Sequence, residues 1–112
     1  MATRAYLSEL EQMVLLAVLR AGDDACGRLI RNDLRETANR HRSLASIYVV
    51  LTRLEGQGFV RSWMSDPTPV RGGRSKRFFA VEPKGVAALR DARLLLEKMW
   101  AGVDESLHPE SA

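Results

Sequence analysis

Cysteine is nearly absent from this sequence, which has a single one, Cys26, in 112 residues. One thiol cannot form an intrachain disulfide, and such sparing use of cysteine is typical of the reducing cytoplasm, where we expect the protein to be. Long apolar runs are also absent, so no segment is expected to span a bilayer. Charged residues interrupt the N-terminal segment MATRAYLSELEQ, which argues against a signal peptide. We therefore expect no association with membranes.

Residues that form catalytic or metal sites are few and scattered. Cys26, His41 and His108 are far apart in the chain, and no paired carboxylates stand in an apolar setting. A metal site needs ligands at a characteristic spacing, and an active site needs a nucleophile beside a base. The sequence therefore predicts neither an enzyme nor a metal ion or organic cofactor.

The length and composition suit one small folded domain. A chain of 112 residues can bury a single core, and a hydrophobic content of 46% favours a folded protein over a disordered one. The net charge of +3 is compatible with nucleic-acid binding but does not require it.

Residues 43–57 have the clearest helical pattern. One apolar stripe follows helical spacing and consists of Ile47, Val50, Leu51 and Leu54. Ser43 precedes it as a candidate N-cap, and Gly58 follows where a left-handed cap would end the helix. The opposite face has short or hydrogen-bonding side chains, namely Ala45, Ser46, Val49, Thr52 and Arg53. That face is either an ordinary solvent face or one that lies in a DNA groove, where small residues and donors are needed.

Two strands separated by a basic loop are predicted after this helix. Residues 59–65 (FVRSWMS) and 76–81 (KRFFAV) have the composition of strands, and the segment between them is rich in Gly and Pro. The phenylalanines and Trp63 are expected to divide between the core and the outer face of the hairpin. A helix, a strand, a basic loop and a strand in this order are typical of a winged helix.

Several of these residues occur together, at the same spacing, in one bacterial family. They are Ile47-Tyr48, Leu51, Arg53-Leu54-Glu55, Gly58-Phe59-Val60, Gly72-Gly73-Arg74-Ser75-Lys76-Arg77-Phe78-Phe79 and Pro83-Lys84-Gly85. From about Leu7 to the last helix, the chain resembles the PadR family of bacterial transcriptional regulators. The resemblance implies a mainly α fold with a small β-hairpin, in which a winged helix-turn-helix precedes a C-terminal dimerisation helix. We expect a DNA-binding domain over 1–82, the dimerisation helix over 83–103 and a flexible tail over 104–112.

Two further helices are predicted before the central one. Ser8 and Glu11 form a capping box for a helix that ends at 21–22, and its broad apolar face is either wholly buried within one monomer or shared with a second subunit or another helix. Asp23 and Asp24 are expected to cap the next helix, over about 25–38. Its inward residues would be Leu29, Ile30 and Leu34, and its arginines, which contact phosphate or form a solvated face, are Arg28, Arg31 and Arg35.

The expected contacts with DNA follow from this arrangement. Residues that would read or lie against bases are Ser43, Ser46, Tyr48, Val49, Thr52 and Arg53, and those that would contact phosphates are Arg42, Arg71, Arg74 and Lys76. Arg77 adds to the basic cluster on the returning arm of the wing, which is either a phosphate-binding arm or a solvated hairpin. Tyr48 has an alternative, in which its ring leans on the edge of the core.

The last helix, from Pro83 to about Val103, has two apolar stripes. One stripe should pack on the winged helix and the other on a second copy. The residues that we assign to dimerisation are Leu89, Ala92, Leu96, Met99, Trp100 and Val103. Some PadR relatives bind small aromatic or lipophilic effectors near the dimer interface, and Trp100 and Met99 would line such a site here; the alternative is interface packing.

Together these features predict a DNA-binding transcriptional regulator, a repressor, that binds a palindromic operator in double-stranded DNA as a homodimer. The recognition helix would be 43–57 and the basic wing 66–77. An alternative is a winged-helix module for protein–protein interaction without DNA binding.

Overall fold

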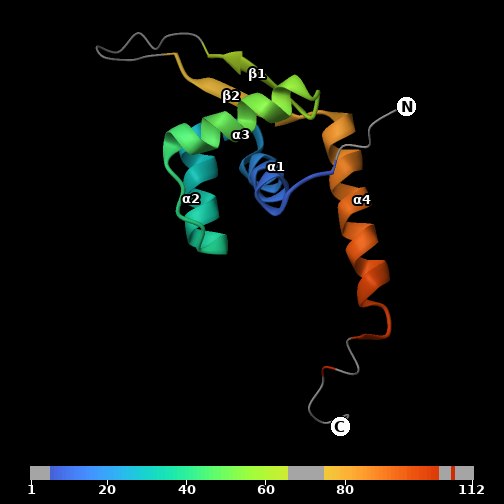
Figure 1. Ribbon diagram of the computed structural model, residues 1–112. Coiled ribbons are helices and arrows are strands. Elements are labelled where there is room, and N and C mark those ends of the chain that lie inside the picture. The colour runs from blue at the N-terminus through green and yellow to red at the C-terminus, as the bar shows by residue number, and fades with distance from the viewer. Residues whose placement is uncertain (1–5, 66–74, 104–106, 108–112) are drawn as a thin grey trace.

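The computed structural model describes residues 6–65, 75–103 and 107 of the chain. The elements are α1 (Glu9–Ala21), the 3₁₀ turn η1 (Gly22–Asp24), α2 (Gly27–Ala38), α3 (Leu44–Gly56), β1 (Val60–Met64), β2 (Arg77–Val81) and α4 (Pro83–Trp100). In Figure 1, α3 crosses above α1, α2 and α4 lie on opposite sides of α1, and the hairpin lies above α3. This confirms the predicted winged helix: mainly α, with one small hairpin and a C-terminal helix.

The first helix begins as predicted. The Ser8 side chain accepts a hydrogen bond from the Glu11 amide (3.1 Å), and the Glu11 carboxylate accepts one from the Ser8 amide (2.8 Å). Val18 is buried, whereas Leu16 and Leu19 on the same helix are 46% and 47% exposed. Of the two alternatives for this helix, complete burial is therefore excluded.

The predicted start of α2 is wrong. Asp23 and Asp24 lie in the 3₁₀ turn, and Cys26 is the N-cap, without a side-chain capping bond. The reason is tertiary, because the Ala25 carbonyl accepts a hydrogen bond from the Phe79 amide (2.9 Å), so this backbone is extended beside β2 instead of starting a helix. Leu29 was also placed wrongly, since it is 38% exposed while Ile30 and Leu34 are buried as expected.

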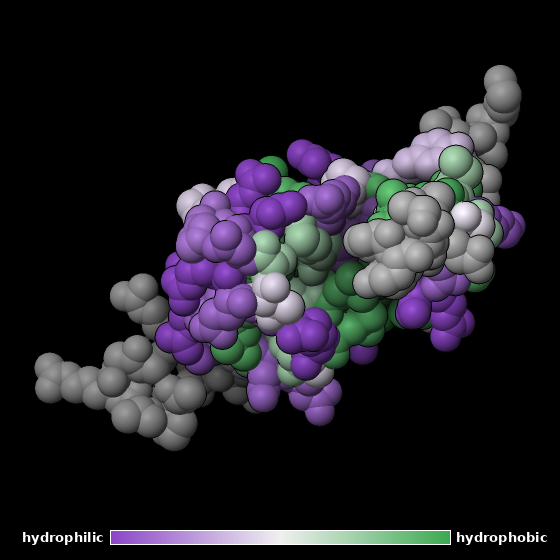
Figure 2. All heavy atoms as spheres, turned by 90° about the horizontal axis from the view of Figure 1, so that it is seen from below, coloured by the Kyte–Doolittle hydropathy of each residue, from purple (hydrophilic) through white to green (hydrophobic). Residues whose placement is uncertain are grey.

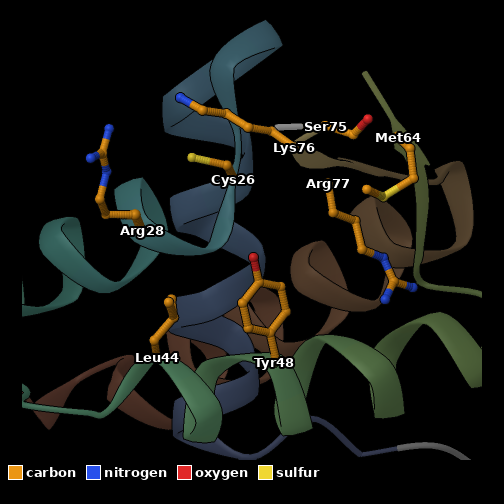
Figure 3. A pocket seen from close by; sticks show the side chains of 8 residues that line it. All are labelled: Cys26, Arg28, Leu44, Tyr48, Met64, Ser75, Lys76 and Arg77. Carbon is orange, nitrogen blue, oxygen red and sulfur yellow. The ribbon is translucent and has the colours of Figure 1, made fainter. Parts of the chain in front are cut away.

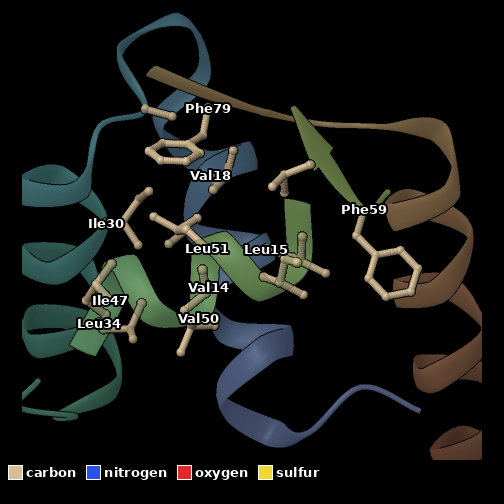
Figure 4. Packing of buried hydrophobic residues seen from close by; sticks show 14 residues of the cluster. Val14, Leu15, Val18, Ile30, Leu34, Ile47, Val50, Leu51, Phe59 and Phe79 are labelled. Carbon is tan, nitrogen blue, oxygen red and sulfur yellow. The ribbon is translucent and has the colours of Figure 1, made fainter. Parts of the chain in front are cut away.

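The core lies where α1, α2 and α3 meet the hairpin (Figure 4). Each helix contributes one apolar face, and the predicted stripe of α3 is buried in full: Ile47, Val50, Leu51 and Leu54. Ser43 is the N-cap of α3, and Gly58, just after its end, has a positive φ of 80°. Both predicted ends of this helix are thereby confirmed.

The hairpin pairs β1 with β2 in antiparallel register, from Val60 opposite Val81 to Met64 opposite Arg77. Phe59 and Phe79 are buried, whereas the ring of Trp63 stacks on Phe78 on the outer side, with centroids 6.2 Å apart. This confirms the predicted division of the aromatic residues. Residues 66–74, which include most of the predicted wing, lie outside the described part of the chain.

The last helix begins with Pro83 at its first turn and ends at Trp100, not at Val103. Its N-cap Glu82 makes no capping bond and instead forms an ion pair with Arg61 (3.0 Å). Gly85 is buried where the helix crosses the chain at Phe59, because a Cβ at Gly85 would collide with the Phe59 carbonyl oxygen. This close crossing anchors the first turns of α4 to the domain. Among the described residues, no helix is both long and apolar enough to cross a membrane.

Candidate nucleic-acid interface

The outward face of α3 is small and polar at most positions. Its exposed residues include Ala45, Val49, Thr52 and Arg53, and Val49 is 59% exposed. Ser46 is half-buried, and its amide donates to the Ser43 hydroxyl oxygen (3.1 Å), so the Ser43 side chain holds the start of the helix. The face opposite the core is therefore free of bulky aromatic residues, as a helix that lies in a major groove requires.

Tyr48 does not belong to this outward face. It is half-buried, and its ring packs on Phe79 at a tilt of 49°, with centroids 6.2 Å apart. The other side of the ring lies against Gly27 at the start of α2. Of the two alternatives for Tyr48, the structure shows the packing at the core edge.

The hydroxyl of Tyr48 points into a hollow of about 480 Å³ between the starts of α2 and α3 and the base of the wing (Figure 3). Its wall is mostly apolar and includes Leu44 and Met64. Three cations also line it: Arg77, which is paired with Glu55, and Arg28 and Lys76, which form no ion pair within the described residues. Cys26 lies at the base of the hollow as a small buried residue, as expected.

The described cations differ in whether an acidic side chain compensates their charge. Five arginines form ion pairs with carboxylates at 3.0 Å or less, namely Arg20, Arg40, Arg61, Arg77 and Arg93. Six others have no side-chain hydrogen bond or ion pair to any described residue: Arg28, Arg42, Arg53 and Lys76, and on α4 also Arg90 and Lys98. The first four of these lie on or beside the outward face of α3, at the start of α2 and at the base of the hairpin. Four of the six unpaired cations among the described residues therefore surround α3, and clustered positive charge of this kind favours the approach of a polyanion.

Arg77 is the exception within the predicted basic wing. Its Nη2 donates to Glu55 on α3 (2.9 Å), its Nε donates to the Ser62 hydroxyl (3.1 Å), and that hydroxyl donates to Glu55 (2.8 Å). This network ties the hairpin to the last turns of the recognition helix. The sequence reasoning missed it, because Glu55, Ser62 and Arg77 lie in three separate elements and nothing in their spacing pairs them.

The other residues predicted to contact phosphate lie before α3 and in the wing. Lys76 is exposed at the base of β2, whereas Arg71 and Arg74 lie outside the described residues. Arg42 is exposed directly before the start of α3. Its guanidinium borders a second basic group, with Arg31, Arg35 and His41, which the sequence did not bring together. In the part of the chain that the structure describes, no cluster of three or more metal-ligating side chains is found.

The predicted dimerisation residues lie on α4 and just beyond it. Met99 and Trp100 are exposed with Leu94, Leu95 and Leu96, Val103 is exposed past the helix end, and Ala92 is half-buried. Leu89 instead packs partly on the core of its own domain. A groove of about 610 Å³ runs between α4 and the segment that leads into α1, and hydrophobic surface is seen on this side of the molecule in Figure 2.

Solved structures of transcriptional regulators share this fold. A regulator from Clostridium thermocellum has a TM-score of 0.68 at 16% identity, over 88% of this chain and 90% of that one. A PadR-like regulator from Bacillus cereus has a TM-score of 0.68 at 17% identity, over 88% and 91%. Bacillus subtilis PadR, solved in complex with operator DNA, has a TM-score of 0.60 at 20% identity, over 74% of this chain and 47% of that one. The chain therefore has the winged-helix fold of PadR-like regulators. No family model and no curated protein match the sequence.

Proposed function

We propose that this chain is a transcriptional regulator of the PadR family that binds double-stranded DNA through α3 and the wing 66–77. The observation that carries the proposal is that four of the six unpaired cations among the described residues, Arg28, Arg42, Arg53 and Lys76, lie around α3, whose outer face is small and polar. Phosphate contacts by such cations supply most of the affinity, and donors on α3 supply the sequence preference. Bacillus subtilis PadR, which has this fold, was solved with operator DNA, and this supports the proposal.

We further propose that the chain acts as a homodimeric repressor on a palindromic operator. The support is the apolar surface of α4, where Leu95, Leu96, Met99 and Trp100 are exposed on the same helix. Contiguous exposed apolar surface of this kind marks interaction sites. A twofold dimer would place two recognition helices about one helical turn, ~34 Å, apart along the DNA. In this dimer Trp100 packs within the interface. The alternative role of Trp100 is to line a site for an aromatic or lipophilic effector.

A direct test is the binding of purified protein to labelled DNA from around its own gene, beside a scrambled duplex, at low and moderate salt. We expect preference for the specific duplex and a fall in affinity as salt rises. Replacing Arg74 and Lys76 together by Ala should weaken both complexes. Arg53→Ala should instead reduce the preference, by about 1–3 kcal/mol if the guanidinium reads a base. Arg90→Ala, which removes an exposed cation of α4, is the matched control.

The competing function is a winged-helix module for protein–protein interaction. If both duplexes bind equally weakly and the wing variant changes nothing, the regulator proposal fails and the interaction module replaces it. A promoter–reporter measurement with and without the protein then separates repression from activation.

A further inference from the structure

The hollow beside Tyr48 has an apolar wall that the described chain leaves uncovered. Leu44, the first residue of α3, and Met64, the last residue of β1, both line the hollow, and both side chains are exposed. The half-buried ring of Tyr48 adds to this wall. A hollow of about 480 Å³ with a mostly apolar wall has the size and character of a site for a small organic molecule. A ligand with an apolar body would remove this surface from water.

The charged side chains at the hollow are all cations. Arg28 and Lys76 are exposed and form no ion pair among the described residues, and no described carboxylate lines the hollow. The Tyr48 hydroxyl points into the hollow and forms no hydrogen bond with any described residue (Figure 3). Two like charges at one small hollow repel each other, and an anion bound there would compensate both.

The hollow is held in shape by contacts behind its wall. The Tyr48 ring is fixed by its contacts with Gly27 and Phe79. At the base of the wing, the Ser65 amide donates to the Lys76 carbonyl (2.8 Å), and the Lys76 amide donates to the Ser65 hydroxyl (2.9 Å). A ligand would therefore meet a preformed site and would lose little affinity to rearrangement of the protein.

This combination of features fits a molecule that is apolar at one end and anionic at the other. An inorganic anion or a phosphate of DNA would contact the cations and leave the apolar wall in water. A neutral apolar molecule would leave the cations uncompensated. A carboxylate on an apolar body meets both requirements, because a guanidinium can bind its two oxygens side by side. Met64 has a flexible, unbranched side chain, which can adapt to apolar bodies of different shape.

We infer that the hollow beside Tyr48 binds a small carboxylic acid with an apolar body. Its carboxylate would lie on Arg28 and Lys76, and its apolar body on Leu44 and Met64. The described residues that line the hollow include none from α4, so this site is separate from the apolar surface of that helix.

Binding at this site should regulate DNA binding, and this part of the inference rests on the proposed function. Arg28 and Lys76 are two of the unpaired cations that we propose to contact DNA. A carboxylate bound to them would compensate their charge before a phosphate could do so. The carboxylic acid and DNA should therefore compete for the chain.

The first measurement titrates sodium octanoate into the full chain without DNA, followed by calorimetry. Octanoate should bind at least about tenfold more tightly than sodium acetate, which lacks the apolar body, and than 1-octanol, which lacks the charge. If either of these controls binds as tightly as octanoate, the assignment of a ligand that is both apolar and anionic is overturned.

Two variants locate the octanoate. Arg28→Gln removes a cation of the hollow and Met64→Gln makes its wall polar, and each should weaken octanoate binding on the order of tenfold. Both residues are exposed, so the variants should fold, which circular dichroism verifies. The matched controls are Arg90→Gln and Met99→Gln, at an exposed cation and an exposed methionine of α4. Weaker octanoate binding in Met99→Gln but not in Met64→Gln would place the ligand on α4 and overturn the inference.

The second measurement follows binding of the specific and scrambled duplexes by fluorescence anisotropy, in sodium octanoate or in sodium acetate at the same concentration. The ionic strength is then equal, and only octanoate should weaken the binding of wild type to both duplexes. Met64→Gln should bind the duplexes like wild type when octanoate is absent, and should need about tenfold more octanoate to release them. Duplex binding that is unchanged by saturating octanoate would overturn the competition.

The failure of this inference and the failure of the proposed function give different results. Intact duplex binding without any binding of octanoate would refute the ligand site and leave the regulator proposal standing. No binding of wild type to any duplex would refute the proposed function. The titration without DNA would still decide whether the hollow binds a carboxylic acid.

Discussion

The ring of Tyr48 lies directly on Gly27, so that a Cβ added at Gly27 would lie 2.7 Å from the Tyr48 Cζ and 2.8 Å from its hydroxyl oxygen. Gly27 is the first residue of α2, and Tyr48 is in the second turn of α3. Because Gly27 has no side chain, α2 and α3 can approach each other closely at this point. The ring of Tyr48 fills that space, and the ring of Phe79 packs against Tyr48.

The first prediction concerns this contact. Gly27→Ala should lower the free energy of unfolding by about 1–3 kcal/mol, because the added methyl overpacks the site. Urea denaturation followed by circular dichroism measures it. Gly56→Ala is the control, since nothing lies within 4 Å of a Cβ there, and it should be neutral or stabilising. Adding Tyr48→Ala to Gly27→Ala should remove the clash, so full additivity of the two losses would contradict the explanation.

The second prediction concerns the network of Glu55, Ser62 and Arg77. Glu55→Gln should lower stability by only about 0.2–1 kcal/mol, because the pair is partly exposed. The same change releases the Arg77 guanidinium toward DNA. Binding to a scrambled duplex should therefore become tighter and steeper in salt, by about 0.9 in the slope for one added phosphate contact, while preference for the specific duplex falls.

Glu97→Gln is the matched control for that variant, since Glu97 pairs with Arg93 on the exposed part of α4. It should leave both duplex affinities unchanged. If Glu55→Gln reduces binding to the two duplexes equally, the ion pair with Glu55 is not what prevents Arg77 from contacting phosphate.

The third prediction is a pH dependence of stability. Hydrogen bonds from Arg20 and Thr37 hold the pKa of Asp33 below its ordinary value of 3.8. A lowered carboxyl pKa means that the stabilisation is complete above the ordinary value and is lost as the pH falls through the lowered pKa. Asp33→Asn should cost about 0.2–1 kcal/mol at neutral pH, and the difference from wild type should shrink in strong acid.

Urea denaturation at several pH values measures this difference. Asp24→Asn, at an exposed carboxylate without an ion pair among the described residues, controls for the loss of one surface carboxylate at neutral pH. A gap between wild type and Asp33→Asn that persists unchanged below the lowered pKa would show that the ion pair is not its source.

The fourth prediction tests the proposed dimer. Replacing Leu96 and Trp100 together by Glu should shift the protein to a monomer and weaken operator binding, because charge would be placed in the apolar surface of α4. Sedimentation equilibrium measures the mass. Val49→Glu places one glutamate at an exposed apolar residue of α3, outside this surface, and it should leave the oligomeric state unchanged. A wild type that sediments as a monomer at high concentration would contradict the homodimer.

The elements of the fold could be predicted from the sequence because their signals are local. The capping box of Ser8 and Glu11, the apolar stripe of α3 and Gly58 after its end each act within a turn or two of the helix. The two strands were predictable for the same reason, since breaker residues bound them on either side. The start of α2 was not, because its backbone pairs with β2, which is far away in the sequence.

In the candidate site, too, local sequence signals do not show which cations are paired. Lys76 and Arg77 are adjacent cations with equal weight in a sequence pattern, yet Arg77 is tied to Glu55 while Lys76 has no ion pair among the described residues. Arg31, Arg35 and His41 read as separate surface residues until the segment 39–43 folds back along α2.

By itself, the sequence determined which segments are helices and strands, where most of them begin and end, and which face of each is apolar, because periodicity and capping act over a few residues. Only the tertiary structure decided that Tyr48 packs on Gly27, which cations are compensated, and which apolar residues of α4 stay uncovered. These depend on distances of a few ångströms between residues far apart in the chain, and Coulomb and packing energies change steeply over such distances.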